Sequence, residues 1–261
     1  MGKKKQWVGF EAINSLMRII PRLDIKNENV IKGINFEGLR VVGNPNKLAK
    51  KYYIDGADEL IYSDCVASLY GRNNLASLVK NAVKDIFIPI TVAGGIRSED
   101  DADLLMKNGS DKLAINTELF KNEIVGKTLI QKYGSQSILL SIQAKKISKT
   151  SWEAYVNFGR DKTDMDVMEW IKKMSKYNFG ELLLTSVDAD GVSGGFDVEL
   201  YEKASKITEI PIIACGGFGK LNHIQELKKY AEIEAISISK ALHYEKISIK
   251  EIKEFIEKIN D

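Results

Sequence analysis

The sequence has few histidines and few cysteines, and this scarcity limits the catalytic and metal-binding chemistry that is available to the protein. Its 261 residues include two of each type, His223 and His243, and Cys65 and Cys215. Both histidines lie late in the chain, which argues against a histidine-centred mechanism, and nothing in the sequence suggests a metal or a nicotinamide cofactor. Both cysteines lie within apolar runs, so we expect reduced, packed thiols in a cytoplasmic protein.

An excess of one charge and long apolar runs are also lacking. The 38 lysines and arginines nearly cancel the 36 aspartates and glutamates, so no nucleic acid or other polyanion is indicated as a partner. No apolar stretch reaches the roughly 20 residues that a membrane-spanning helix needs. The length instead suits a single eight-stranded α/β barrel, which typically has about 250 residues.

The first 16 residues stand apart from the rest of the chain. Three lysines and a short apolar segment resemble the start of a signal peptide, but no long apolar core or cleavage site follows. We therefore expect residues 1–16 to be an extension and residues 17–261 to form one domain.

The most informative feature that is present is an internal repeat. Val92–Arg97 returns as Ala214–Gly219, and Asp58–Tyr62 returns as Gly180–Leu184. Each segment is built on a short apolar run, which is typical of a buried parallel strand that presents polar groups at its carboxyl end. Two equal halves of this kind predict a single (β/α)₈ barrel with pseudo-twofold symmetry. A doubly wound open sheet is the alternative.

Strand-like and helix-like segments alternate eight times along the chain. Apolar residues recur at helical spacing in Leu75–Ile86 and Ile249–Ile259. Only two connections are long, residues 27–44 and 145–162, and long loops after barrel strands are candidate lids over a catalytic rim. The expected strands are Ile19–Ile25, Glu59–Cys65, Ile88–Ala93, Lys112–Ile115, Ile138–Gln143, Glu181–Val187, Ile212–Cys215 and Ala235–Ser239.

Two glycine pairs end matched strands and indicate two phosphate sites. Glycine lets the backbone approach a ligand closely, and N–H groups at a helix start favour an anion. The repeat places the pairs on opposite sides of one barrel mouth, so we expect a substrate with a phosphate at each end; tight turns are the alternative. The first site is expected to contain Gly94, Gly95, Asn116 and Thr117, and the second Gly216, Gly217, Ser239 and Lys240.

Carboxylates near the ends of strands are candidates for proton transfer. Asp24 and Asp64 end the first two strands, and Asp190 with Gly191 follows Thr185 after the sixth. A carboxyl group whose pKa is raised by burial can act as an acid or a base. For Asp190 and Gly191, a simple turn is the alternative.

The counterpart of Asp24 in the repeat is Gln143, where a two-carboxylate enzyme would have an acid. A glutamine cannot carry the proton, but it can orient a substrate through hydrogen bonds. Residues two apart on a strand share a face, so Arg22 should point into the barrel beside Asp24. A neighbouring guanidinium favours the ionised form of Asp24 and makes it a poorer acid.

Charged residues also begin four of the expected strands, at the opposite end of the barrel. Arg18, Glu59, Lys112 and Glu181 supply two cations and two anions that could pair in a ring. On the residues alone, a salt-bridged plug that seals the core is the simpler interpretation of this ring.

Taken together, these motifs resemble the cyclase subunit of imidazole glycerol phosphate synthase. The likeness covers residues 17–261, and its order and spacing make it specific. It is carried by Arg18–Lys26, Val30–Phe36, Gly56–Leu60, Gly94–Arg97, Asp111–Thr117, Glu181–Ser186, Asp188–Gly191 and Gly216–Gly219.

The resemblance implies a barrel whose N-terminal face binds a glutaminase subunit of the HisH type. Ammonia from glutamine would pass through the barrel and attack a bis-phosphate ribulosyl-formimino carboxamide. The implied products are imidazole glycerol phosphate, for histidine biosynthesis, and aminoimidazole carboxamide ribotide. The resemblance implies no cofactor.

The family's functional positions can be placed on this chain. Its charged ammonia gate falls on the four-residue ring, so the resemblance reverses the plug interpretation. Asp111 matches a contact to the glutaminase, and Lys32 matches a lid lysine that reaches the substrate. The paired catalytic aspartates fall on Asp24 and on the position of Gln143.

Four departures from the family pattern leave three functions open. Gln143 replaces an aspartate, Arg22 a small residue, Lys240 a small hydroxyl residue and Ala93 a glycine. The first function is a cyclase in which Asp24 does most of the acid–base work. The second is a paralogue that supplies ammonia to a sugar amidotransferase, which makes acetamidino groups on surface sugars. The third is a scaffold that only activates the glutaminase.

Overall fold

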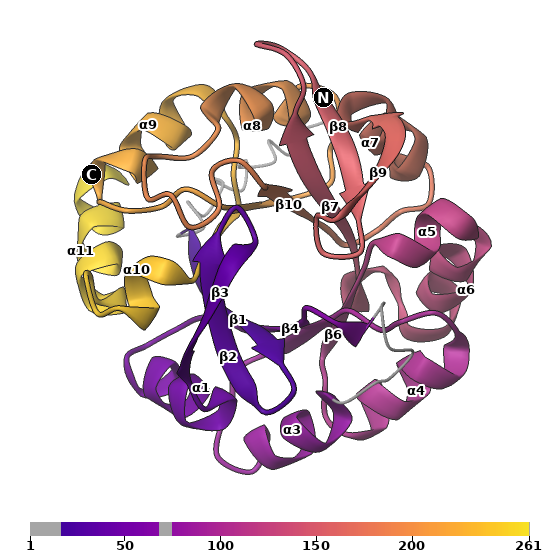
Figure 1. The fold of residues 1–261 in the computed structure, drawn as a ribbon, viewed down its shortest axis with the longest axis horizontal. Coiled ribbons are helices and arrows are strands. Elements are labelled where there is room, and N and C mark those ends of the chain that lie inside the picture. The colour runs from indigo at the N-terminus through magenta and orange to yellow at the C-terminus, as the bar shows by residue number, and fades with distance from the viewer. Residues whose placement is uncertain (1–16, 68–74, 261) are drawn as a thin grey trace, which may run out of the picture.

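A computed structural model describes residues 17–67 and 75–260, in which eight parallel strands close into a barrel with helices outside it (Figure 1). The expected extension, residues 1–16, lies outside the described residues. Within the described part of the chain, no helix is long and apolar enough to cross a membrane.

Parallel pairing runs without a break around the barrel. Each strand pairs with the next, and β12 pairs with β1 through Ile19 opposite Ile236. This closure confirms the predicted (β/α)₈ barrel and excludes the open-sheet alternative. The barrel strands are β1 Arg18–Lys26, β4 Leu60–Asp64, β5 Ile90–Ala93, β6 Lys112–Ile115, β7 Ile138–Lys146, β10 Glu181–Ser186, β11 Ile212–Cys215 and β12 Ala235–Ile238.

Helices on the outside have recognisable start signals. The Asn44 side chain accepts hydrogen bonds from two N–H groups of α1, and Pro45 occupies its first turn. Ser98 caps α4 in the same way. The helices are α1 Pro45–Ile54, α3 Leu75–Ala82, α4 Glu99–Lys107, α5 Thr117–Lys121, α6 Ile124–Tyr133, α7 Val167–Ser175, α8 Val198–Ser205, α9 Asn222–Tyr230, α10 Lys240–His243 and α11 Ile249–Asn260, with a 3₁₀ turn at Ser135–Ser137.

The two long connections are antiparallel ribbons, not irregular loops. The first arm consists of β2 Asn29–Ile34 and β3 Glu37–Gly43, and the second of β8 Trp152–Val156 and β9 Asp161–Asp166. The first arm pairs with the end of β1 and the second with the end of β7, so each arm extends a barrel strand beyond the rim. Figure 1 shows both arms crossing the near end of the barrel.

The inside of the barrel is filled in layers. One residue from every barrel strand, with Cys215 in addition, forms a buried cluster separate from the larger core between strands and helices. Because side chains two apart share a face, a charged layer lies below this cluster and a polar layer above it. The apolar layer consists of Ile20, Ile61, Ala93, Ala114, Leu139, Leu183, Ile213, Cys215 and Ala235.

Tyr201 of α8 joins a helix to the carboxyl end of the barrel. Its fully buried hydroxyl accepts a hydrogen bond from the N–H of Cys215 at 3.1 Å and lies 2.6 Å from the Cys215 carbonyl oxygen. The hydroxyl therefore satisfies backbone groups at the point where β11 leads into the second glycine pair.

We predict that Tyr201→Phe lowers the free energy of unfolding by about 2 kcal/mol, because buried polar groups lose their partner. Urea denaturation measures this. Tyr230→Phe, at an exposed tyrosine of α9, is the matched control and should leave the midpoint unchanged. Equal midpoints for Tyr201→Phe and the unaltered protein would contradict the assignment.

Candidate active site at the mouth of the barrel

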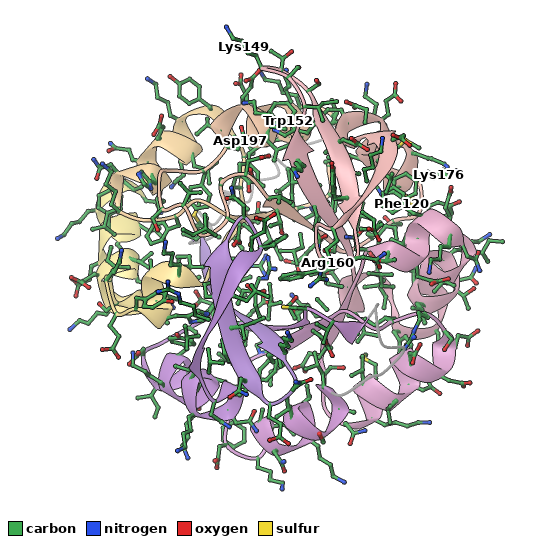
Figure 2. The ribbon with its side chains drawn as sticks, in the orientation of Figure 1. Phe120, Lys149, Trp152, Arg160, Lys176 and Asp197 are labelled. Carbon is green, nitrogen blue, oxygen red and sulfur yellow. The ribbon has the colours of Figure 1, made fainter. Side chains whose placement is uncertain are left out.

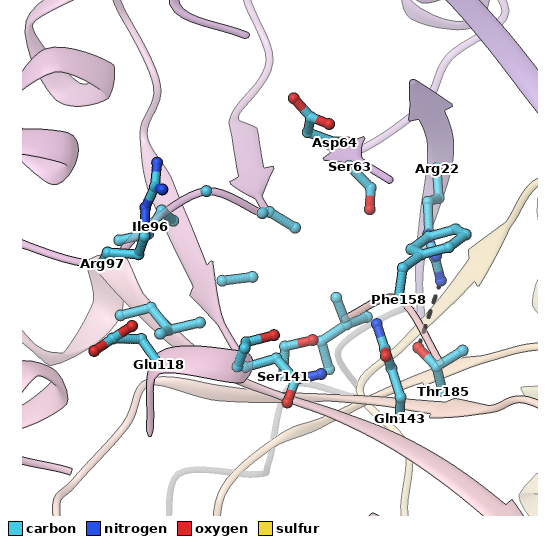
Figure 3. A pocket seen from close by; sticks show the side chains of 18 of the residues that line it. Arg22, Ser63, Asp64, Ile96, Arg97, Glu118, Ser141, Gln143, Phe158 and Thr185 are labelled. Carbon is cyan, nitrogen blue, oxygen red and sulfur yellow. Dashed lines mark hydrogen bonds between the residues drawn. The ribbon is translucent and has the colours of Figure 1, made fainter. Parts of the chain in front are cut away.

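The carboxyl ends of the barrel strands surround a cavity beneath the two arms. Its lining brings together Gly94, Gly95, Asn116 and Thr117, the four residues expected to form the first phosphate site. Arg22, Gln143 and Thr185 lie at the other end of the same cavity (Figure 3). The structure thus places the first expected site and the expected chemical centre in one continuous space.

Arg22 lies inside the barrel, directly beside Asp24. Both side chains are buried, and the Arg22 Nε donates to Asp24 Oδ1 at 2.7 Å. A second guanidinium nitrogen lies 3.2 Å from the Cys215 sulfur and 3.5 Å from the Thr185 hydroxyl, the contact dashed in Figure 3. Arg22 therefore occupies the polar layer that follows the apolar filling of the barrel.

Lys32 of the first arm completes a buried ion network. Its Nζ lies 3.1 Å from Asp24 Oδ2 and 2.6 Å from Asp190 Oδ1. Burial acts to lower the pKa of Lys32, but Asp190 and Asp24 outweigh burial and hold that pKa above its usual value. Lys32 thus lies at the mouth and binds the two carboxylates that flank it, while its contact with a substrate stays a prediction of the resemblance.

Asp24 is held as a carboxylate. Burial acts to raise the pKa of Asp24, but Arg22 and then Lys32 outweigh burial and hold the pKa below its usual value. At neutral pH this group is available as a base or counter-ion, and it is a poor proton donor. Asp64 differs, because burial raises its pKa even though it accepts hydrogen bonds from the N–H groups of Val66 and Ala67.

Gln143 faces the same cavity from the opposite strand, β7. Its side-chain oxygen accepts a hydrogen bond from the N–H of Gly159 at 2.6 Å, which fixes the amide against the turn of the second arm. The geometry agrees with a side chain that orients neighbouring groups and transfers no proton.

Two aromatic residues close the mouth, and the sequence did not reveal them. Phe36 and Phe158, from the turns of the first and second arms, stack with ring centroids 4.3 Å apart. The Arg22 guanidinium carbon lies 5.5 Å and 5.8 Å from these two rings, within the range of cation–π attraction. Arg160, which lies over the barrel opening in Figure 2, donates to the carbonyl oxygen of Cys65 at 3.1 Å.

Glycine is required where strands lead into the first phosphate site. Gly94 has a φ of +93°, and a Cβ there would lie 2.6 Å from the carbonyl oxygen of Asp64. Arg97 and Lys121 line the same cavity and add positive charge. Asn116 donates to the carbonyl oxygen of Tyr155, which belongs to the second arm.

The residues expected at the second site also lie together. Gly216, Gly217, Ser239 and Lys240 line a smaller cavity, with Asp190 and Gly191. The Lys240 Nζ donates to the carbonyl oxygen of Gly191. Lys32 lines this cavity as well, so the Lys32–Asp190 pair forms part of its wall.

At the N-terminal end of the barrel, the four charged residues form a ring. Arg18 pairs with Glu59 and with Glu181, and the Lys112 Nζ lies 2.9 Å and 2.7 Å from the same two carboxylates. Each carboxylate is therefore shared by two cations. Asp111, beside the ring, is exposed and accepts a hydrogen bond from the N–H of Ile90 at 2.8 Å.

Each histidine has a hydrogen-bond neighbour that gives it a structural role. His243 Nδ1 lies 2.7 Å from the Tyr52 hydroxyl, and burial lowers the pKa of His243 to about 4, so its ring is neutral. His223 accepts a hydrogen bond from the N–H of Gly219. Among residues 17–67 and 75–260, no three His, Cys, Asp or Glu side chains are arranged to hold a metal ion.

Comparisons with known proteins agree with this geometry. The family of histidine biosynthesis proteins matches residues 18–248. The imidazole glycerol phosphate synthase subunit HisF of Legionella pneumophila is 53% identical over 207 residues, 79% of this chain and 98% of that protein. The subunit of the same name from Bacillus cereus (strain G9842) is 40% identical over 236 residues, 90% of this chain and 94% of that protein. The one from Clostridium botulinum (strain Okra / Type B1) is 38% identical over 240 residues, 92% and 95% of the two chains.

We predict that Arg22→Met raises the pKa of Asp24, because it removes the strongest stabilisation of the carboxylate. A carboxyl with a depressed pKa contributes stability at neutral pH that is lost as the pH falls through the folded-state pKa, so the variant should lose less stability on acidification. Carbon-13 NMR of the carboxyl group measures the pKa. Lys51→Met, beside the exposed Asp55, is the control. An unchanged Asp24 titration in Arg22→Met would contradict the proposed pairing.

Proposed function

Because the chain belongs to the histidine biosynthesis protein family, we propose that it is the cyclase subunit of an imidazole glycerol phosphate synthase, fed with ammonia by a glutaminase subunit. We also propose that residues 17–261 form the synthase unit and that residues 1–16 are an extension to it. HisF relatives that align over most of this chain support the assignment.

The observation that carries the proposal is the layered interior of the barrel. A ring of paired charges lies at the N-terminal end, an apolar layer follows, and the Arg22–Asp24 pair lies at the mouth. Ammonia is small and uncharged in its reactive form, so an apolar interior suits its passage and disfavours ions. We propose that the ring is the entrance and that the glutaminase binds around Asp111.

At the mouth, the chain's residues suit an addition to a phosphorylated substrate. The two glycine-lined cavities would hold the phosphates of the bis-phosphate carboxamide, with Lys32 between them. Asp24, held ionised, would accept a proton as ammonia adds, and Gln143 would orient the reacting group. Cyclisation would then give imidazole glycerol phosphate and release aminoimidazole carboxamide ribotide.

A second candidate is favoured by one specific observation. Asp24 is already paired with Arg22, and its counterpart Gln143 is fixed to the N–H of Gly159, so neither group is a free acid. A barrel with this arrangement could deliver ammonia to a different acceptor. We propose a sugar amidotransferase, which forms acetamidino groups on surface sugars, as the alternative recipient.

The decisive experiment measures turnover of the bis-phosphate carboxamide by the isolated chain with an ammonium salt at alkaline pH. A cyclase should turn over, and Asp24→Asn should lower the rate by at least about 10²-fold, the usual cost of losing a general base. Gln131→Asp, at an exposed position on α6, is the control for Gln143→Asp. No turnover by the unaltered chain, with activity appearing in Gln143→Asp, would reject the cyclase and favour the amidotransferase partner.

A separate prediction concerns the ring of charges at the N-terminal end, the proposed entrance for ammonia. In the complex with a glutaminase subunit, Lys112→Met should lower glutamine-dependent turnover about tenfold, because the contacts of Lys112 with Glu59 and Glu181 are both lost from the ring. Turnover with added ammonium should change much less. Lys107→Met, an exposed lysine on α4, is the control. Equal losses with both nitrogen sources would show that the ring acts only on stability.

A further inference from the structure

The two cavities at the mouth of the barrel differ in volume, although the sequence repeat predicts equivalent sites. The first, which runs from Gly95 and Thr117 to Arg22 and Gln143, encloses about 80 Å³. The second, around Gly217 and Ser239, encloses about 20 Å³. Since a single water needs roughly 10–15 Å³ by this measure, the first can accept a phosphate group and the second cannot.

Lys240 accounts for the difference in size. Its half-buried side chain crosses the second cavity, and its Nζ donates to the carbonyl oxygen of Gly191. Gly191 packs closely against the first arm, where a Cβ at this position would lie 2.2 Å from the carbonyl oxygen of Gly33. The flexible lysine is therefore the part of the cavity wall that can change position.

Two hydroxyl groups identify what the second cavity is suited to bind. Ser237 and Ser239 line it, both are more than nine-tenths buried, and their Oγ atoms have no hydrogen-bond partner among the described residues. An unpaired buried hydroxyl is costly, and both can donate to an oxygen-rich anion. These donors, with a lysine ammonium beside them, match the oxygens of a phosphate.

Lys240 also lies on the boundary with a second, outer space. A groove between the first arm and α10 is lined by Arg40, Lys246 and Tyr244, and it shares Lys32 and Lys240 with the inner cavity. This outer space is basic, because its lining among the described residues contains four lysines and arginines and one acidic side chain, Glu37. An anion attracted to the groove would meet Lys240 before it reached Ser237 and Ser239.

We propose that Lys240 is a cationic latch on the second phosphate site. The phosphate enters from the basic groove, displaces Lys240 from the Gly191 carbonyl oxygen, and occupies the space that the lysine leaves, where the two serine hydroxyls donate to it. Binding is therefore sequential: the open first site holds one phosphate of the substrate, and the second phosphate then displaces Lys240 and fills the second site. This order rests on the proposed function, whereas the latch itself concerns the binding of phosphate alone.

Inorganic phosphate is the probe, and the backbone amide signals of Gly95 and Gly217 report the two sites by NMR. In the unaltered protein, Gly217 should reach its midpoint at a phosphate concentration about tenfold higher than Gly95, because one hydrogen bond of a charged group must first be broken. Lys240→Ser should bring the two midpoints within about threefold of each other. Lys246→Ser removes an equal charge from the groove and should leave the difference in place.

Two results would overturn the latch. One is equal midpoints for Gly95 and Gly217 in the unaltered protein. The other is weaker phosphate binding at Gly217 in Lys240→Ser, which would make Lys240 an ordinary phosphate ligand. Thermal unfolding of each variant confirms that both are folded. Because the titration uses no substrate and no glutaminase, it can succeed or fail independently of the turnover assay.

Discussion

The mouth of this barrel depends on four buried charges that satisfy one another. Arg22 and Lys32 are positive, Asp24 and Asp190 are negative, and all four side chains are almost completely excluded from solvent. Removing Asp24 would take away the carboxylate that Arg22 binds, and removing Lys32 would take away the cation that Asp190 binds; a buried charge that loses its partner costs several kcal/mol. The network is therefore stable only as a unit, and every element that contributes to it is fixed in place.

That requirement connects the barrel to its arms. Strand β1 contributes Arg22 and Asp24, the first arm contributes Lys32, and the connection after β10 contributes Asp190. The Arg22 guanidinium also lies near the stacked rings of Phe36 and Phe158, so the turns of both arms meet over the same charge. The resulting mouth holds Asp24 as a carboxylate that is paired with Arg22 and Lys32. Its chemistry consequently favours a fixed carboxylate base and orientation of the substrate.

Much of the barrel could be predicted from the sequence, because local patterns of apolar and polar residues determine where its strands lie. Apolar runs ending in glycine or aspartate located the barrel strands, and spacing by two placed Arg22 beside Asp24. The arms were expected as loops, and this was wrong. The outer strand of each arm, β3 or β9, has no buried residue and pairs with the inner strand of the same arm, so no strong alternation marks it. Contact between Phe36 and Phe158 joins two left-handed turns far apart in the chain, which no local pattern can report.

The two halves of the pseudo-twofold repeat share one backbone arrangement but differ in the side chains that they place at the mouth. At one pair of matched positions, Asp24 is a charged member of the network and Gln143 is a neutral acceptor for an arm N–H. At another, Thr117 accepts a hydrogen bond from the N–H of Asn157, whereas Lys240 spans a cavity to Gly191. Backbone geometry survives such exchanges because the barrel strands are held by main-chain pairing and apolar packing. One side of the mouth of a symmetric barrel can therefore hold an open site, while the opposite side holds a site that a side chain such as Lys240 controls.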